Sequence, residues 1–393
     1  MTPLGSGNIR YSGQSGPLFK LVFSTGLMTV LTLGIYRFWS KTRIRKYIWS
    51  STSVDGDAFE YTGTGLEKLL GFLIAIVFLA VYLAVVQLVL TFFGLGVQLE
   101  PESQAEVIAQ LISIYLSFFS VVPFLLFAVY RARRYKLART RLRGLRFGMD
   151  NAAWGYALRA IGYWLVTILS LGLLMPFATF GKEKYMTDRS HYGDARFEQG
   201  GSWQALYPAM KHLFIGFGLM LLGGMLTAVM QAPALLVVTG LGYIWLMIGF
   251  VSYQVRSFAY LTNTKTLGGA VTFTADPSTG EVIKRFIIGG LILSLAGAVG
   301  FGVVAGIGAF LFSGGMMMIG LAQMVVLAIL YMFVLVGLGA LGLVLITQPI
   351  IAHITGTMQV RNVDALNAIR QRASDKGADA EGFADALDLG GAI

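Results

Sequence analysis

The positively charged residues of this 393-residue chain fall into four blocks, and the gaps between the blocks constrain the fold most. All 30 Lys and Arg lie within residues 10–68, 131–211, 256–285 and 361–376. The three gaps hold 62, 44 and 75 residues without a Lys or Arg. Each gap is long enough for two membrane crossings of about 20 residues. The sequence therefore predicts an integral membrane protein.

Each gap has a break near its middle, and this predicts a helical hairpin. The breaks are GVQLEPESQ at 96–104, MQAP at 230–233 and FSGGM at 312–316. Because positive residues stay on the cytoplasmic side, we expect all four basic blocks and both chain ends in the cytoplasm. The six predicted transmembrane helices are 67–96, 106–130, 212–230, 233–253, 286–311 and 316–347.

Composition supports this class of protein. The chain is 56% hydrophobic and only 13% charged, whereas soluble domains carry about 25% charged residues. It has no cysteine, which excludes disulfides and thiolate metal sites. The N-terminal MTPLGSGNIRYSGQSG lacks a basic region followed by an apolar core, so we expect no cleaved signal peptide.

Two more apolar stretches, 18–39 and 154–180, have basic residues at both ends. A single crossing would place one basic flank outside, against the rule for positive residues. Each stretch also carries an early charge, Lys20 or Arg159, and helix-weakening glycine or proline further along. We therefore predict two re-entrant or interfacial helix pairs that enter the membrane and return, with a single crossing as the alternative.

These two stretches belong to segments that resemble each other. TLGIYRFWSKTRIRKY at 32–47 aligns with SLGLLMPFATFGKEKY at 170–185. Each is followed by a polar segment with a glycine turn, which predicts a β-hairpin. A single hairpin is marginal in water, so we expect several to pair into one small cytoplasmic sheet. The predicted hairpins are 50–63, 138–150, 187–200 and 262–276, with a weaker match at 353–362.

The predicted fold is an all-α polytopic membrane protein with an internal duplication. It has six transmembrane helices in three hairpins, two re-entrant segments and the small sheet. The predicted organisation is a first repeat at 1–130, a second at 131–253, a third, degenerate repeat at 254–352 and a cytoplasmic C-terminal tail at 353–393.

Basic residues beside the membrane form the first candidate site. The run RARRYKLARTRLRGLR at 131–146 directly follows a predicted transmembrane helix. Such clusters bind anionic lipid headgroups at about 1 kcal/mol per residue. An acidic protein partner is the alternative, and nucleic acid is not expected. The candidate lipid or partner contacts are Lys41, Arg43, Arg45, Lys46, Arg131, Arg133, Arg134, Arg139, Arg141 and Arg143.

Three charged residues lie closest to the bilayer: Lys20, Arg159 and Glu67. Charges in membrane segments are candidates for transport or gating, but all three lie near segment ends and can reach the headgroups. Small residues that recur every four positions predict a face for close helix packing, with a pore-lining face as the alternative. The members of this stripe are Gly290, Ser294, Ala298, Gly302 and Gly306.

Sequence motifs for catalysis or cofactor binding are weak. GTGLEKLLG at 63–71 lacks the third glycine of G-x-G-x-x-G, because Lys68 stands there. Asp188, His191 and Glu198 lie across a predicted hairpin whose alternation separates their directions, so no metal site is expected. We predict no catalytic residue, cofactor or metal, and a protein that is not an enzyme.

TLGIYRFWSKTRIRKY and FEYTGTG, with the second copy SLGLLMPFATFGKEKY and HYGDARF, resemble the YjgN-like family of bacterial inner-membrane proteins. The resemblance extends from residue 9 to about residue 370. It implies an inner-membrane protein of a family classed as a domain of unknown function, and it supplies no catalytic residue. Family members are encoded near a membrane-associated zinc metallopeptidase, which implies a partner of that class.

The leading hypothesis is a non-enzymatic scaffold or adaptor of the bacterial inner membrane. It would organise a partner through its cytoplasmic hairpins and basic face, and anionic lipids would contact the same face. The alternative is a transporter or channel for an anionic solute or lipid, with the re-entrant segments lining the path.

Overall fold

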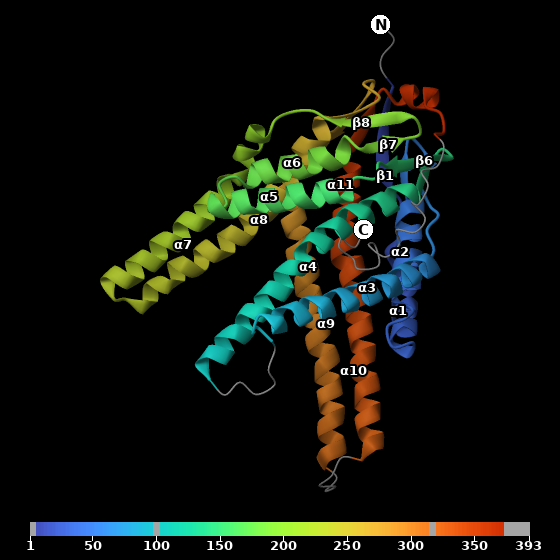
Figure 1. Cartoon of the computed structure of the whole chain (residues 1–393). Helices are drawn as coiled ribbons and strands as arrows, with labels where there is room; N and C mark the ends of the chain where they lie inside the picture. Colours follow the sequence, from blue (N-terminus) through green and yellow to red (C-terminus); the bar gives the residue numbers. More distant parts are fainter. Residues whose placement is uncertain (1–4, 97–102, 314–319, 373–393) are drawn as a thin grey trace. The chain divides into compact units, whose positions relative to one another are not determined.

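The computed structural model describes residues 5–96, 103–313 and 320–372 (Figure 1). The chain forms two compact units. Unit 1 contains the residues up to 60 together with 198–368, and unit 2 contains 61–197 together with the residues from 369 on. These units do not follow the predicted repeat boundaries at 130 and 253, because segments distant in sequence pair within unit 1. Most of the predicted breaks at 96–104 and 312–316, and the tail from 373, lie outside the described residues.

Six strands of unit 1 pair in the order β3-β2-β1-β11-β10-β9. Gly7 of β1 lies opposite Val360 of β11, and Arg10 of β1 lies opposite Ser53 of β2, in antiparallel pairs. The strands are β1 (Ser6–Tyr11), β2 (Thr52–Val54), β3 (Asp57–Ala58), β9 (Lys265–Leu267), β10 (Val271–Ala275) and β11 (Met358–Arg361).

Two of these strands correct the prediction. The segment 353–362 is neither a tail nor a hairpin, because it contains the end of a helix and the single strand β11. The strand β1 was not predicted at all, because a strand whose partners are distant in sequence has no turn beside it. The chain is therefore not all-α, and its strands form a larger part of the fold than the small sheet that was predicted.

Unit 2 carries the strand order β8-β7-β6-β5-β4. The β5–β6 turn places Arg143 at φ 50° and Gly144 at φ 75°, the two positive φ angles that a tight hairpin of this twist requires. The β5–β6 and β7–β8 pairs match the hairpins predicted at 138–150 and 187–200. The strands are β4 (Glu60–Tyr61), β5 (Thr140–Leu142), β6 (Leu145–Met149), β7 (Ser190–Tyr192) and β8 (Ala195–Gln199).

Six helices of the described chain are long and apolar enough to cross a membrane, which confirms the six predicted spans. Unit 2 holds α3 (Gly65–Phe92) and α4 (Gln104–Ala138). Unit 1 holds the others, with short helical segments at their ends. These are η1 (Trp203–Met210), α7 (Lys211–Met230), η2 (Pro233–Leu235), α8 (Leu236–Asn263), α9 (Thr279–Ser313), α10 (Leu321–Gly342), η3 (Leu343–Thr347), α11 (Gln348–Gly356) and η4 (Val363–Ala368).

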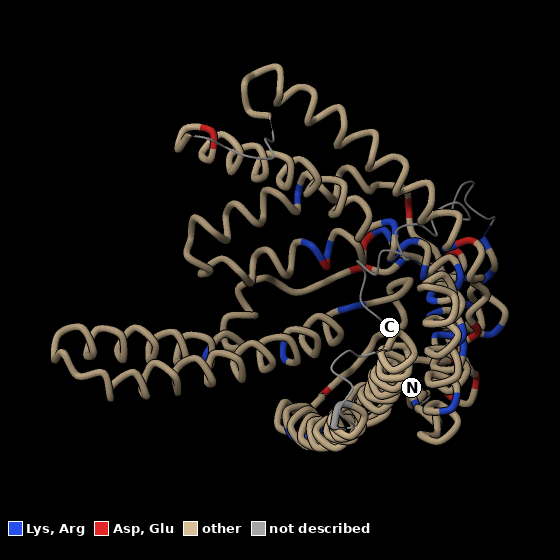
Figure 2. The backbone as a smooth tube through the Cα atoms, turned by 90° about the horizontal axis from the view of Figure 1, so that it is seen from below, with Lys and Arg blue, Asp and Glu red and all other residues tan. Residues whose placement is uncertain are grey.

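Several helices are longer than the apolar runs that predicted them. The helix α4 ends at Ala138 rather than at 130, and α8 ends at Asn263 rather than at 253. Arg, Lys, Ala and Tyr continue the helical hydrogen bonding beyond the apolar run, because charge stops a membrane span but not a helix. Figure 2 shows that the long helices carry few charges along their length.

Two of the hairpins are held together in different ways. In α7–α8 the backbones touch at glycines spaced by seven, Gly216 and Gly223 on α7 and Gly242 and Gly249 on α8. In α3–α4 polar side chains bridge the helices, because Gln87 Nε2 donates to the Ser117 hydroxyl over 2.7 Å. Small residues and interhelical hydrogen bonds are the two means by which helices associate in lipid.

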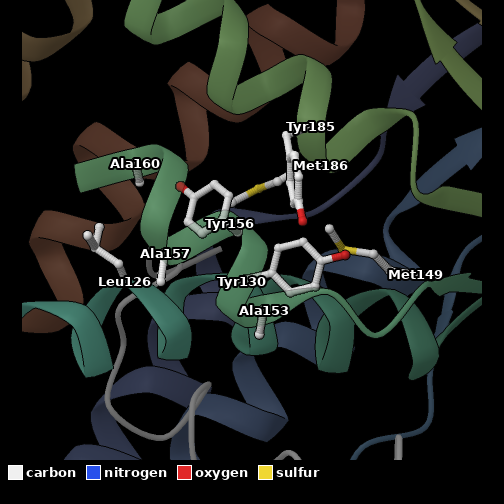
Figure 3. Packing of buried hydrophobic residues seen from close by; sticks show 9 residues of the cluster. All are labelled: Leu126, Tyr130, Met149, Ala153, Tyr156, Ala157, Ala160, Tyr185 and Met186. Carbon is white, nitrogen blue, oxygen red and sulfur yellow. The ribbon is translucent and has the colours of Figure 1, made fainter. Parts of the chain in front are cut away.

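The buried cluster of unit 2 lies where α4, β6 and two further helices, α5 (Ala153–Leu169) and α6 (Met175–Thr187), meet (Figure 3). Three tyrosine rings pack together at its centre, with the Tyr130 and Tyr156 centroids 5.6 Å apart and Tyr185 6.0 Å from each. The other members are Leu126, Met149, Ala153, Ala157, Ala160 and Met186.

Candidate functional site

The stretches predicted to be re-entrant are two helix–turn–helix pairs. In unit 1, α1 (Ser15–Leu31) is followed by α2 (Arg37–Ser50). In unit 2, α5 (Ala153–Leu169) is followed by α6 (Met175–Thr187). Both first helices have 17 residues, and each pair is joined by a five-residue turn at 32–36 or 170–174. The sequence alignment of the two stretches therefore corresponds to the same local structure.

The two turns have the same backbone conformation. Leu33 and Leu171 both lie at φ 51°, and the following Gly34 and Gly172 lie at φ 93° and φ 86°. A leucine rarely adopts a positive φ, which costs roughly 1–3 kcal/mol. The shared Leu-Gly pair is thus a specific feature of both turns.

The turns satisfy their own backbone hydrogen bonds. All six amides from 32 to 37 donate to acceptors within residues 28–34, and all six from 170 to 175 donate to acceptors within 166–172. One acceptor in each turn is a hydroxyl, Thr32 Oγ1 at 2.9 Å and Ser170 Oγ at 3.0 Å. Irregular backbone survives in a bilayer only where its polar groups are paired, because no water is there to bind them.

The ends of both turns are apolar and project from the protein. Leu33 is 95% exposed and Leu171 is 89% exposed, and Leu31 and Leu169 beside them are also exposed. Leucines at nearly full exposure on a turn are unfavourable in water, since burying such a side chain is worth about 1.5–3 kcal/mol. The two turns combine an apolar tip with hydrogen-bonded amides.

A tyrosine joins the far ends of each helix pair. The Tyr47 hydroxyl donates to the Gln14 carbonyl over 2.9 Å and accepts from the Gln14 amide over 2.8 Å. At the same spacing, the Tyr185 hydroxyl donates to the Ala152 carbonyl over 3.0 Å.

Burial, with the neighbouring Tyr47, raises the pKa of Tyr11 to about 12, so this phenol stays protonated and neutral.

The three predicted intramembrane charges have different surroundings. Lys20 and Arg159 are exposed on their own units. Glu67 is instead fixed within unit 2, because it accepts from the Tyr135 hydroxyl and from Arg139 Nη2, both over 2.8 Å. Glu67 thus holds α3 and α4 together at their charged ends.

The predicted basic contacts divide into buried and exposed groups. Arg45 and Arg134 are only 3% exposed, so they cannot serve as the headgroup contacts that were predicted. The Arg45 guanidinium lies over the Trp49 ring, and Arg134 Nε donates to the Met149 carbonyl over 2.8 Å. Their long side chains cover apolar surface and cap backbone groups instead.

The remaining basic residues lie at or near the surface. Arg133 forms a two-pronged ion pair with Glu183, with N–O distances of 2.7 and 3.0 Å. Arg43 and Lys46 are exposed on α2. The half-buried members of the predicted set are Lys41, Arg131, Arg139, Arg141 and Arg143.

The small-residue stripe of α9 does not pack against its neighbour α10. An added Cβ at Gly290, Gly302 or Gly306 would meet nothing within 4 Å, and Ser294 and Ala298 are exposed. The adjacent face of α9 makes the close contacts. An added Cβ at Gly289 would meet the Leu345 carbonyl. Added Cβ atoms would also meet Leu338 from Gly297, Val334 from Gly300 and Leu327 from Gly308. The prediction of small-residue packing was right for α9, but it placed that packing on the wrong face.

Two features of the helices were not predicted from the sequence. The α7–α8 glycines recur every seven residues, a signal that is present in the sequence but that was sought only at spacing four. Burial lowers the pKa of Lys182 on α6, and no sequence pattern marks this lysine as buried. Within 5–96, 103–313 and 320–372, no three His, Asp or Glu side chains gather as metal ligands.

Comparison with known proteins gives a family but no activity. The sequence profile described as bacterial protein of unknown function (DUF898) matches residues 6–386. The inner membrane protein YjgN of Salmonella typhimurium is 24% identical over 154 residues, which cover 37% of this chain and 33% of that protein. Its namesake in Escherichia coli O157:H7 is 23% identical over 163 residues, 42% of this chain and 35% of that protein. The matched part is thus about a third of each relative's length, and no solved structure matches the chain.

Proposed function

We propose that this chain, which belongs to the DUF898 family of bacterial proteins of unknown function and is similar to inner membrane proteins named YjgN, is a non-enzymatic scaffold of the inner membrane. In this proposal the three helical hairpins cross the membrane, and α1–α2 and α5–α6 enter it from the cytoplasmic side and return. The strands and both chain ends lie in the cytoplasm, where they hold a partner protein.

The observation that carries the proposal is the pair of leucine turns. Their exposed apolar tips favour contact with acyl chains, and their hydrogen-bonded amides lower the cost of placing a turn there. The matching turns, tyrosine bonds and helix lengths also support an internal duplication as the origin of the two pairs.

The basic blocks support the cytoplasmic placement of the strands, since Lys and Arg stay on that side. The partner we propose is a membrane-associated metallopeptidase, held through the exposed basic face of α2. A transporter is the alternative, with Lys20 and Arg159 lining its path. Both side chains are exposed on their units, which favours anchors over an enclosed path.

Depth measurements test the membrane part of the proposal. The chain has no cysteine, so single spin-labelled cysteines can be introduced without removing others. Labels at Leu33→Cys and Leu171→Cys should collide with apolar oxygen more than with a water-soluble nickel complex, and Ser53→Cys and Glu198→Cys, on strands at or near the surface, should show the reverse. Aqueous exposure of Leu33 and Leu171 in vesicles would refute the re-entrant arrangement.

Sidedness and partnership need separate measurements. In intact cells an impermeant thiol reagent should label Ser103→Cys and leave Ser53→Cys unlabelled.

Purification of the chain in mild detergent should also recover a bound membrane protease. The double variant Arg43→Glu with Lys46→Glu should lose that protease while its helical content stays unchanged. Substrate flux into vesicles that is lost in Lys20→Ala and Arg159→Ala would favour the transporter instead.

A further inference from the structure

Two arginines of unit 2 stack on Tyr185 of α6, whose hydroxyl reaches the start of α5. The guanidinium carbon of Arg189 lies 3.7 Å from the centroid of the Tyr185 ring, and that of Arg159 lies 4.8 Å from it. The two guanidinium groups are thus no farther apart than the sum of these distances. Arginine stacks on aromatic rings readily because its guanidinium is planar and weakly hydrated.

Neither arginine has a carboxylate partner within the described part of the chain. Arg159 donates to the Gly155 carbonyl over 3.1 Å, and Arg189 donates to the Tyr185 carbonyl over 3.1 Å. The acids nearest in sequence are already paired, Asp188 with Lys184 at 3.0 Å and Asp150 with Arg196 at 3.3 Å. Among the described residues, the two positive charges are therefore held close together without an ion-paired carboxylate of their own.

The start of α5 adds to this positive potential. The residue before the helix is Ala152, whose side chain cannot cap the first-turn amides, and the structure records no side-chain cap there. Unbonded amides at a helix N-terminus favour an anion. The Tyr185 hydroxyl donates to the Ala152 carbonyl, which fixes the ring that carries both arginines beside this turn.

The neighbouring side chains indicate the source of the anion. Trp154 is 50% exposed and Leu158 is 68% exposed, and they precede Arg159 on α5 by five residues and by one residue. Apolar side chains beside a paired positive site suit a ligand with an anionic head and an acyl tail. A guanidinium donates to two phosphate oxygens at once, so a phosphate head fits these residues.

We propose that Arg159 and Arg189, stacked on Tyr185, bind the phosphate of an anionic phospholipid headgroup at the start of α5. The site goes beyond the scaffold function and does not require it, since it depends only on contact of unit 2 with a membrane surface. Free inorganic phosphate has the same chemistry and is the competing source of the ligand.

A thermal-shift titration of the full chain in neutral detergent tests the site. Phosphatidylglycerol should raise the unfolding temperature of the wild type in a saturable way, and phosphatidylcholine should not. At about 1 kcal/mol per arginine near an anionic surface, Arg159→Gln or Arg189→Gln should weaken the apparent affinity about 5-fold, and the double variant about 30-fold. Arg256→Gln, the same change at another exposed arginine, should weaken it less than about 2-fold.

Three results would overturn the proposal. Equal affinity in the wild type and in the double variant would exclude the site. An equal loss in Arg256→Gln and Arg159→Gln would show diffuse charge attraction. Protection by inorganic phosphate equal to that by phosphatidylglycerol, at matched ionic strength, would overturn the lipid as the source. If the double variant fails to fold, Arg159→Gln alone decides, because that side chain is exposed and donates its hydrogen bond to its own helix, with the Tyr185 ring as its contact outside α5.

Discussion

Replacing Gly223 with alanine should loosen the α7–α8 hairpin. A Cβ at this position would lie 2.5 Å from the Thr239 backbone nitrogen and 2.6 Å from its hydroxyl oxygen. The obstacle is backbone, so the two helices must separate by about an ångström, and contacts along the hairpin weaken with them. Overpacking of this kind costs about 1–3 kcal/mol.

The adjacent Gly224 supplies a matched control, because an added Cβ there meets nothing within 4 Å. Alanine is about 1 kcal/mol better than glycine in a helix, and both variants gain this amount. The difference between their unfolding free energies therefore isolates the steric term. We expect Gly223→Ala to be less stable than Gly224→Ala by about 1–3 kcal/mol.

Equilibrium unfolding in mixed micelles, followed by circular dichroism, measures this difference. A second pair repeats the test on α8: Gly242 would place its Cβ 2.5 Å from the Met220 nitrogen, whereas Gly240 has open space. The double variant Gly223→Ala with Gly242→Ala should cost less than the sum, since the first substitution already separates the helices. Equal stabilities within both pairs would refute close backbone packing of this hairpin.

Three further predictions concern other parts of the chain. Tyr47→Phe removes both hydrogen bonds to Gln14 and should lower stability by about 1 kcal/mol in thermal unfolding; an unchanged midpoint would mean that the bonds contribute nothing. Gly56→Ala places a side chain at φ 94° and should cost about 1 kcal/mol, whereas Gly16→Ala, in open space at an ordinary φ, should cost nothing. Burial lowers the pKa of Lys182 below 10.5, so the unfolded chain binds its proton more tightly and the charge destabilises the fold at pH 7. Lys182→Met should therefore raise the unfolding temperature at pH 7, by an amount that shrinks as the pH approaches 10.5, and a gain independent of pH would contradict this cause.

The membrane helices were predictable because one quantity defines them, the length of sequence that contains no Lys or Arg. Long runs without Lys or Arg leave few alternatives to a membrane span, and their breaks give the hairpins. Turns were predictable for a similar reason, since Asp55-Gly56 and Arg143-Gly144 adopt the positive φ angles that such pairs favour. The uncharged runs and the turn residues each lie within one short stretch of sequence, so neither signal requires knowing which distant segment packs against that stretch.

Features that depend on a distant partner were not predictable in this way. On α9, glycines occur on two adjacent faces, and only the positions of α10 and η3 decide that Gly289 and Gly300 are in contact while Gly290 and Gly302 are not. The buried Arg134 looks in sequence like any other member of a basic run. At the candidate lipid site, Arg159 was recognised as a charge in an apolar stretch, but its neighbour Arg189 lies 30 residues away and is brought to it only by the fold.

The pairing of β1 with β11 sets an order for biogenesis. Gly7 is synthesised about 350 residues before its partner Val360. At roughly 5–20 residues per second, β1 waits about 20–70 s for β11, while the helices between them insert into the membrane. During this interval the N-terminal strand has an open edge that other nascent chains can pair with. A chaperone that covers this edge, or slow codons that delay the synthesis of β11, would change the yield of folded protein without changing its final structure.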